Sequence, residues 1–298
     1  MPMKQLHLPV LLAEVIHYLT PRDGGVYVDG NLGLGGHTEA ILMASNPGGR
    51  VVGFDWDEQA LELARIHLAK YSGRVEFVRR NFAEVKDVLN ELGIARVDGL
   101  LLDLGLSSLQ LGVSCGRGFS FQGSEPLDMR MDVRGGETAA DLLNHASEEE
   151  LADIFYYYGD ERQARRIAAH VAGFRKEQPL LTTDQLVKVV EEAVPPRFRP
   201  KKIHVATKVF QALRIAVNHE LDNLEKILAC ASEIVKPQGR ICIISFHSLE
   251  DRLVKRAFRD NSALKMVTSR AVVANEDEVK RNPRSRSARL RVASVREQ

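Results

Sequence analysis

The segment VYVDGNLGLGGH, residues Val26–His37, decides the fold class of this 298-residue chain. Its apolar start predicts a strand that ends at Asp29 and runs directly into closely spaced glycines, the arrangement of a nucleotide-type cofactor site. The acidic-x-Gly-x-Gly-x-Gly spacing of S-adenosylmethionine enzymes is matched by Asp29, Asn31, Gly33 and Gly35, with Asn31 in the first glycine position. Asparagine suits that position because, after glycine, it adopts positive φ most readily.

The residues that follow favour the same kind of cofactor. A dinucleotide-binding GxGxxG turn fits less well, because it would need a third glycine at position 38, where Thr38 stands. The next predicted strand, RVVGFD, ends at Asp55, 20 residues after Gly35. A carboxylate at that place accepts hydrogen bonds from the hydroxyls of a ribose. The two acids and the turn together predict a cofactor with a nucleoside part.

Composition is that of an ordinary globular protein, with 44% hydrophobic and 27% charged residues. The chain contains no apolar run of membrane-spanning length, and its first residues lack the order of a secretory signal, so we expect no membrane association and a cytoplasmic location. Cys115, Cys230 and Cys242 lie far apart without CxxC spacing, which predicts neither a disulfide framework nor a zinc site.

Charge is unevenly distributed along the chain. The net charge is only +1, yet the last 19 residues, 280–298, hold one lysine, six arginines and one glutamate. A second cluster, PPRFRPKK at 195–202, adds four cations and no acid. Such runs are often only solvated, but two of them in one chain favour a polyanionic partner such as nucleic acid.

Strands and helices alternate at short intervals from residue 26 to 109, which predicts βαβ units and a parallel sheet. The predicted strands are 26–30, 50–55, 75–82 and 97–105, and the predicted helices are 37–45, 58–71 and 82–92. In such sheets ligands bind beyond the carboxyl ends of the strands. We therefore expect Asp29, Asp55, Phe82 and Asp103 to converge there.

The alternation then stops and resumes late in the chain. Helical patterns follow residue 133, among them a capping box of Ser147 with Glu150 and an apolar face of Ala164, Ile167, Ala168 and Val171. A single long helix is predicted over 205–235. A buried strand returns at 239–248 and is predicted to run into a helix capped by Ser248. Two closing segments, ALKMVTS and SARLRVASV, are predicted to form an antiparallel hairpin. The predicted fold class is α/β, a doubly wound Rossmann-like methyltransferase sheet (1–112 and 206–298) with an inserted helical substrate-recognition domain (113–205).

Six longer motifs make the pattern specific. In chain order they are DGNLGLGGHTEAIL, GFDWDEQAL, LLDLGLSSLQL, RGFSF, PLDMRMD and ISFHSLEDRLVKR. They closely resemble the bacterial small-subunit ribosomal RNA cytosine-N4 methyltransferases, the RsmH or MraW family. The likeness extends from His7 to the C-terminal NPRSRSARLR segment. This chain departs from the commonest family pattern at Leu32, Leu34 and Leu106, none of which removes a polar group.

The resemblance implies a function and a set of site residues. It implies S-adenosylmethionine as cofactor, N4-methylcytidine in the decoding centre of 16S rRNA as product, the 30S subunit as partner, and a homodimer. The positions that match the family's cofactor contacts are Gly35, Gly36, His37, Asp55, Phe82, Asp103 and Gln110. Asp103 is also a candidate to orient the target amine, and His247, after the fifth strand, is a candidate to line the pocket for a flipped base.

Structural interpretations compete with these assignments. Asp29 can simply brace the glycine turn, Phe82 can belong to the core, and His37 can contact a ligand through its backbone N–H alone. His247 can be an ordinary strand-end histidine, and without HExxH spacing it gives no reason to expect a metal.

Three other functions remain open from the sequence. Methylation of cytosine C5 would need a cysteine nucleophile, and no Pro-Cys pair occurs. A small-molecule methyltransferase would leave the two basic segments unexplained. A non-catalytic ribosome-assembly factor would not need the glycine turn, Asp55 or Asp103.

Overall fold

The computed structural model describes residues 8–105, 116–121 and 123–297. The chain divides into two compact units. The first, here called the sheet unit, contains residues 1–107 and 221–298, and the second, the helical unit, contains residues 108–220. Each is described by itself.

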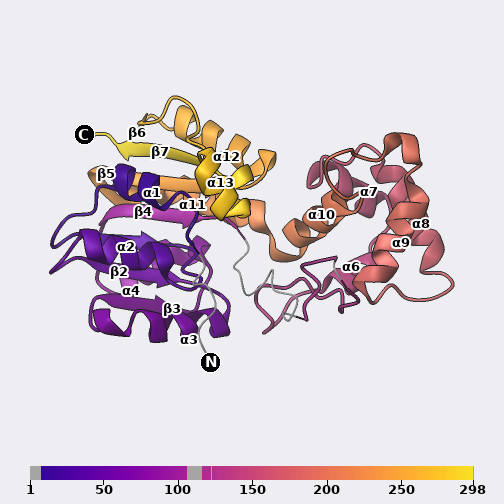
Figure 1. Ribbon diagram of the computed structural model, residues 1–298. Helices are drawn as coiled ribbons and strands as arrows, with labels where there is room; N and C mark the ends of the chain where they lie inside the picture. Colours follow the sequence, from indigo (N-terminus) through magenta and orange to yellow (C-terminus); the bar gives the residue numbers. More distant parts are fainter. Residues whose placement is uncertain (1–7, 106–115, 122, 298) are drawn as a thin grey trace. The chain divides into compact units, whose positions relative to one another are not determined.

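The sheet unit is built on seven strands in the order β3-β2-β1-β4-β5-β7-β6, with β1 near the centre (Figure 1). The strands are β1 (Val26–Asp29), β2 (Arg50–Phe54), β3 (Val75–Val78), β4 (Val97–Asp103), β5 (Val235–Ser245), β6 (Leu264–Met266) and β7 (Arg289–Val295). The first five run parallel, whereas β7 runs antiparallel to both of its neighbours. The predicted closing hairpin is therefore confirmed as the pair β6–β7.

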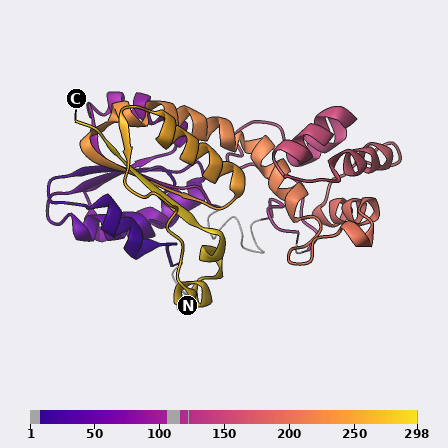
Figure 2. The ribbon, with the colours of Figure 1, turned by 90° about the horizontal axis from the view of Figure 1, so that it is seen from above.

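Helices cover both faces of this sheet because successive side chains of its apolar strands point to opposite faces. The helices are α1 (Leu12–Leu19), α2 (Gly36–Ala44), α3 (Glu58–His67), α4 (Val85–Glu91), α11 (Glu220–Ile234), α12 (Ser248–Asp260) and α13 (Glu276–Arg281). In β4, Leu101 packs with α1, α2 and α3, and its neighbours Leu100 and Leu102 pack with α4, α11 and α12. Figure 2 shows orange α11 and α12 on one side of the sheet and indigo α1 on the other.

The helical unit contains α6 (Ala139–His145), α7 (Glu148–Tyr157), α8 (Ala164–Phe174), α9 (Thr183–Ala193) and α10 (Thr207–Asn218). The capping box of Ser147 with Glu150 at the start of α7 is confirmed. On α8, the predicted apolar stripe from Ala164 to Val171 is buried, and Arg165 and Arg166 are exposed.

The single long helix predicted over 205–235 is wrong. Two helices, α10 and α11, meet at His219, which adopts a left-handed conformation with φ 50° and ends α10. Helix α10 packs with α6 and α7 and belongs to the helical unit, so the unit boundary lies after Glu220 rather than after residue 205. The first boundary lies after Ser107 rather than after residue 112.

The RGFSF and PLDMRMD motifs fold together within the helical unit. Phe119 is buried, and Phe121 stacks on His204 with ring centroids 4.8 Å apart. Met129 has φ 58°, and the Asn218 side chain donates to its carbonyl oxygen at 2.8 Å. These two motifs therefore contribute to the packing of this unit, whatever else they contact.

The predicted fold class, a doubly wound α/β sheet with a helical insertion between its fourth and fifth strands, is confirmed. In the part of the chain that the structure describes, no helix has both the length and the apolar composition needed to span a membrane.

A buried carboxylate joins three segments at the amino edge of the sheet. Asp98, in β4, is 7% exposed; it accepts hydrogen bonds from Arg22 at 2.6 Å, Lys236 at 2.8 Å and the backbone N–H of Val26 at 3.0 Å. Burial alone would raise the pKa of Asp98, but these donors outweigh it and lower the pKa below its ordinary value.

Replacing Asp98 by Asn should destabilise the sheet unit by about 2 kcal/mol at pH 7, because Arg22, Lys236 and the Val26 N–H lose a buried, ionised acceptor. Since folding lowers the pKa of Asp98, its contribution is present above the unfolded value of about 3.9 and is lost as the pH falls through the folded value. Urea unfolding of both proteins at several pH values should show the gap shrinking below about pH 4. The exposed Asp87→Asn is the matched control, and a gap independent of pH would contradict this account.

Candidate active site

The side chains predicted to converge do lie at one edge of the sheet unit. Strands β1 and β4 pair in parallel, with Asp29 beside Leu101, and β4 ends two residues later at Asp103. Asp55 directly follows β2, which pairs with the other side of β1. The carboxyl ends of the parallel strands therefore bring Asp29, Asp55 and Asp103 to the same edge, as the alternating pattern predicted.

The glycine turn between β1 and α2 has left-handed backbone at Gly33, with φ 53°, and at Gly35, with φ 84°. A Cβ atom at Gly35 would also come within 2.8 Å of the Leu68 side chain, so glycine is required there for two reasons. The expectation for Asn31 is wrong, because Asn31 is not among the residues with positive φ. Its Oδ1 atom is instead buried without a hydrogen-bond partner.

Asp29 braces the glycine turn, which is the structural role that the sequence offered for it. It is 1% exposed and accepts a 2.7 Å hydrogen bond from Thr38 Oγ1 and a 3.3 Å bond from the backbone N–H of Asn31. Burial raises the pKa of Asp29, while His37 and the Thr38 hydroxyl oppose that rise. The threonine at the position where a dinucleotide turn has its third glycine therefore has a definite role as the donor to Asp29.

His37 lies in the first turn of α2 and faces Asp103. Its side chain is 7% exposed, and its Nε2 atom is 3.6 Å from Asp103 Oδ2. Both ring nitrogens of His37 and Oδ1 of Asp103 are buried without a hydrogen-bond partner. Buried polar atoms are rarely left unsatisfied, so this pair has the character of a site that completes its hydrogen bonds with a ligand.

Asp55 is held by backbone donors on both oxygens. The N–H groups of Gly33 and Asp57 donate to its two carboxylate oxygens, each at 2.9 Å. Burial nevertheless raises the pKa of Asp55 to about 6, because it outweighs these two bonds and adds to repulsion from Asp57 and Asp29. Trp56, the only tryptophan of the chain, comes directly after it.

Phe82 and Gln110 are the two other predicted contacts. Phe82, in a short 3-10 helix (Phe82–Glu84) after β3, is 5% exposed and packs in the core beneath one face of the sheet. It lies next to Gly30, where a Cβ atom would come within 3.2 Å of the Phe82 side chain. Gln110 lies outside the described residues.

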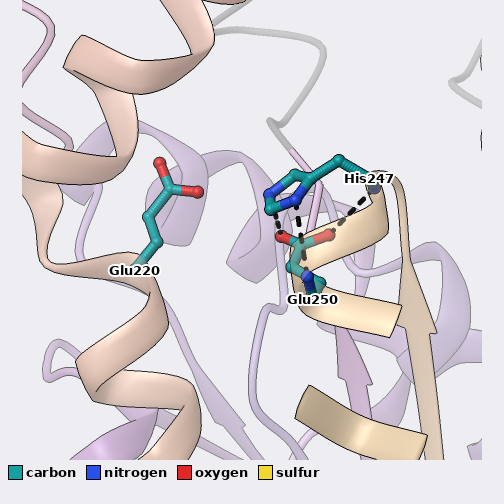
Figure 3. Close-up of side chains that lie close together, drawn as sticks. All are labelled: Glu220, His247 and Glu250. Atoms are coloured by element: carbon teal, nitrogen blue, oxygen red, sulfur yellow. Dashed lines mark hydrogen bonds and ion pairs between the residues drawn. The ribbon is translucent and has the colours of Figure 1, made fainter. Parts of the chain in front are cut away.

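His247 caps the helix that follows β5. Its Nδ1 accepts from the Glu250 N–H at 3.4 Å, and Glu250 Oε2 accepts from the backbone N–H groups of Phe246 and His247 (Figure 3). The prediction that Ser248 caps this helix is wrong, because Ser248 is its first helical residue. His247 Nε2 lies 3.1 Å from Glu250 Oε1 but is buried without hydrogen-bond geometry to any partner.

The arrangement offers groups of the kinds that a nucleoside linked to an amino acid would need. The N-terminus of the nine-residue α2 presents backbone N–H groups that suit a carboxylate. Asp103 suits an ammonium group, and Asp55 suits ribose hydroxyls. The unsatisfied atoms of Asn31, His37 and Asp103 agree with a ligand that fits here.

Comparison with known proteins decides the family. The profile of the MraW methylase family matches residues 4–296. The chain belongs to this family. The Desulfotalea psychrophila protein named ribosomal RNA small subunit methyltransferase H is 59% identical over 98% of this chain and 99% of its own. The proteins of the same name from Geotalea uraniireducens and Sorangium cellulosum are 51% and 49% identical, over 96% and 98% of this chain and 97% and 91% of their own.

Sequence reasoning missed several residues that shape the site of this MraW family member. Pro9 packs against the glycine turn, since a Cβ atom at Gly36 would come within 2.5 Å of Pro9 Cγ. Glu278 accepts a 2.7 Å hydrogen bond from the Leu11 N–H across 267 residues of sequence, and no local pattern signals such a contact. The sequence did single out Thr38, because this residue replaces the third glycine of the GxGxxG spacing.

Affinity for S-adenosylmethionine should rise with pH through about 6 and level off above 7. Asp55 is the predicted acceptor for the ribose hydroxyls, a role that needs its ionised form, and burial raises the pKa of this group to about 6 in the free protein. Binding at pH 5 should therefore be about tenfold weaker than at pH 7. Calorimetry or Trp56 fluorescence would measure this, with Asp55→Asn as the control that removes the pH dependence. A flat wild-type profile would contradict the assignment of Asp55.

Proposed function

We propose that this chain transfers a methyl group from S-adenosylmethionine to the N4 amine of a cytosine in the decoding centre of 16S rRNA. The observation that carries the proposal is the buried His37–Asp103 pair, unsatisfied beside a glycine turn, in a chain of the MraW methylase family. The family and the fold imply S-adenosylmethionine as the donor. The small-subunit RNA is the substrate named for relatives that share up to 59% of this sequence.

When bound, S-adenosylmethionine supplies an electrophilic methyl group on a positively charged sulfur. The chain's part is to bind and orient. The turn with Gly35, Gly36 and His37 offers backbone donors, and Asp55 is the acceptor for ribose. Phe82 and Gln110 remain proposed contacts, Phe82 as a wall beneath the turn.

Asp103 is the residue that we assign to the target amine. The N4 lone pair of cytosine is delocalised into the ring, so the amine is a poor nucleophile until an acceptor holds its hydrogens in a bent geometry. Asp103 Oδ1 is an unsatisfied buried acceptor at the end of a central strand. Catalysis is then dominated by positioning of the two reacting groups, without a covalent enzyme intermediate. The competing role for Asp103 is to bind the ammonium group of the cofactor.

Methylation at cytosine C5 is disfavoured by the environment of the cysteines. Cys242 is fully buried in β5, and burial raises the pKa of its thiol to about 12, which keeps it protonated and unreactive. Burial also raises the pKa of Cys230, whose thiol donates to the Ile227 carbonyl oxygen. Cys115 lies outside the described residues.

The RNA substrate is supported by exposed cations of the helical unit. Arg162, Arg165 and Arg166 are exposed around the start of α8, and Arg197 lies over the half-exposed Phe198 ring at 4.7 Å. A small-molecule methyltransferase would have no use for these groups, and a non-catalytic assembly factor would have none for Asp55 and Asp103. We further propose the 30S subunit as the substrate particle, a cytoplasmic location and a homodimer.

The test is to incubate the purified protein with labelled S-adenosylmethionine and unmodified 30S subunits, digest the RNA and identify the methylated nucleoside by mass spectrometry. We expect N4-methylcytidine at one position. A different methylated nucleoside would overturn the assignment of cytosine N4 as the target, but S-adenosylmethionine would remain the assigned cofactor. Incorporation into free RNA but not into subunits would overturn only the choice of particle.

Asp103→Ala should lower kcat by about 100-fold or more, because the amine loses its acceptor. The dissociation constant for S-adenosylmethionine should change less than about threefold. Single-turnover methylation and calorimetry measure the two quantities separately. Asp87→Ala, which removes an exposed carboxylate of α4, is the control. Equal losses of turnover and cofactor affinity would assign Asp103 to the cofactor instead.

A further inference from the structure

The basic segment at the C-terminus is part of the catalytic sheet rather than a free tail. Strand β7 lies between β5 and β6. Arg291 is 8% exposed, and its Nε donates to Asp251 Oδ1 at 2.6 Å. Arg289 contacts the same carboxylate at 3.3 Å. Arg291 is therefore committed to a buried ion pair within the sheet unit, whereas the Arg289 side chain is 54% exposed and makes only the longer contact.

The register of β7 delivers the preceding residues to the active-site edge. Ile244 of β5 pairs with Asp103 on one side and with Leu290 on the other. Because β7 runs antiparallel to β5, its first residues lie at the edge where the parallel strands end. The 3-10 turn η4 (Pro283–Ser287), which contains the PRSRS sequence, comes directly before β7 and therefore lies at that edge.

Hydrogen bonds fix this turn against the N-terminal segment. Asn282 donates from its side chain to the Leu8 carbonyl oxygen at 2.9 Å, and Ser285, 1% exposed, donates to the Asn282 carbonyl oxygen at 2.8 Å. The same N-terminal segment carries Pro9, which packs against Gly36 beside His37. A continuous set of contacts thus joins η4 to the glycine turn.

Arg284 is the partly buried cation of this turn. It is partly buried, whereas Arg281 and Arg286 on either side of it are exposed. Burial lowers the pKa of Arg284, and the negative charge of Asp103 opposes that shift, which agrees with the position of η4 at the strand ends. A guanidinium remains charged under such conditions, and its planar fork suits phosphate.

The charge of the edge explains why a cation is needed here. Asp29, Asp55, Asp57 and Asp103 all lie at the strand ends, a surrounding that favours a cationic methyl donor but repels RNA. A nucleotide that enters must bring its phosphate close to these acids. The N-terminus of α2 suits the carboxylate of S-adenosylmethionine, so the phosphate of the RNA is the anion that still needs a cationic partner.

We propose that Arg284 binds the backbone phosphate of the target nucleotide and so holds the cytosine at Asp103. The proposal rests on the RNA methyltransferase function above. It assigns buried Arg291 to the stability of the fold and Arg284 to contact with the substrate. Phosphate contacts of this kind position a nucleic acid without reading its bases.

The test compares Arg284→Gln with Arg259→Gln, which removes the same charge at the exposed far end of α12. Arg284→Gln should raise the KM for 30S subunits by about tenfold and reduce the slope of log K against log salt by about 0.7 to 1. Its affinity for S-adenosylmethionine should stay within about twofold of the wild type. Arg259→Gln should change none of these quantities, and Arg284→Lys should restore part of the RNA affinity.

A second measurement locates the contact. An RNA hairpin that contains the target cytosine, without its methyl group, is synthesised with a neutral methylphosphonate in place of the phosphate of that nucleotide. The modification should weaken binding to the wild type but have little further effect on Arg284→Gln, since the two changes remove one interaction. Additive losses, or a loss of S-adenosylmethionine affinity with RNA affinity unchanged, would overturn the proposal. Thermal unfolding identifies a misfolded variant, in which case Arg284→Lys and the methylphosphonate RNA with wild-type protein still decide. Wild-type methylation of 30S subunits tests the underlying function independently.

Discussion

The 2.7 Å hydrogen bond from Thr38 Oγ1 to Asp29 Oδ2 is the interaction on which the rest of the site depends. It ties the end of a central strand to the first turn of α2, inside a core where Asp29 is 1% exposed. A buried carboxylate without such donors would cost several kcal/mol, so the turn must adopt the conformation that supplies them. That conformation places His37, one residue before Thr38, opposite Asp103. The geometry of the reacting edge thus follows from a bond that no ligand needs to touch.

Local sequence patterns predicted much of this structure because they report local physics. Apolar runs predicted the five parallel strands, and the acids that end three of them predicted the shared edge. The Ser147–Glu150 spacing predicted the start of α7. The errors arose where a long-range contact or a competing cap prevailed. His247 rather than Ser248 caps α12, and the left-handed His219 divides a run of helix-forming residues into two helices. Asn31 has the residue type for a left-handed position but does not occupy one.

The charge of a segment was the sequence feature that predicted least about which residues could contact RNA. A +6 segment suggested one RNA-binding tail, yet burial and register divide it into residues with different tasks. Arg291 neutralises Asp251 within the sheet unit, and a buried pair of this kind is costly to break but adds little affinity for any partner. Net charge is a property of composition, whereas the charge that a substrate meets depends on which side chains the strands carry inward.

The order of the strands has a further consequence for how the site forms. Residues before the insertion supply the glycine turn, Asp55 and Asp103, and residues after it supply β5, β7 and the turn with Arg284. Because β7 pairs between β5 and β6, the sheet is incomplete until Arg289–Val295 are in place. Contacts such as Leu11–Glu278 close loops of more than 260 residues, and their entropic cost must be offset by burial across the whole unit. The active edge therefore depends on pairing between segments from both sides of the insertion, and its stability is shared with the whole sheet unit.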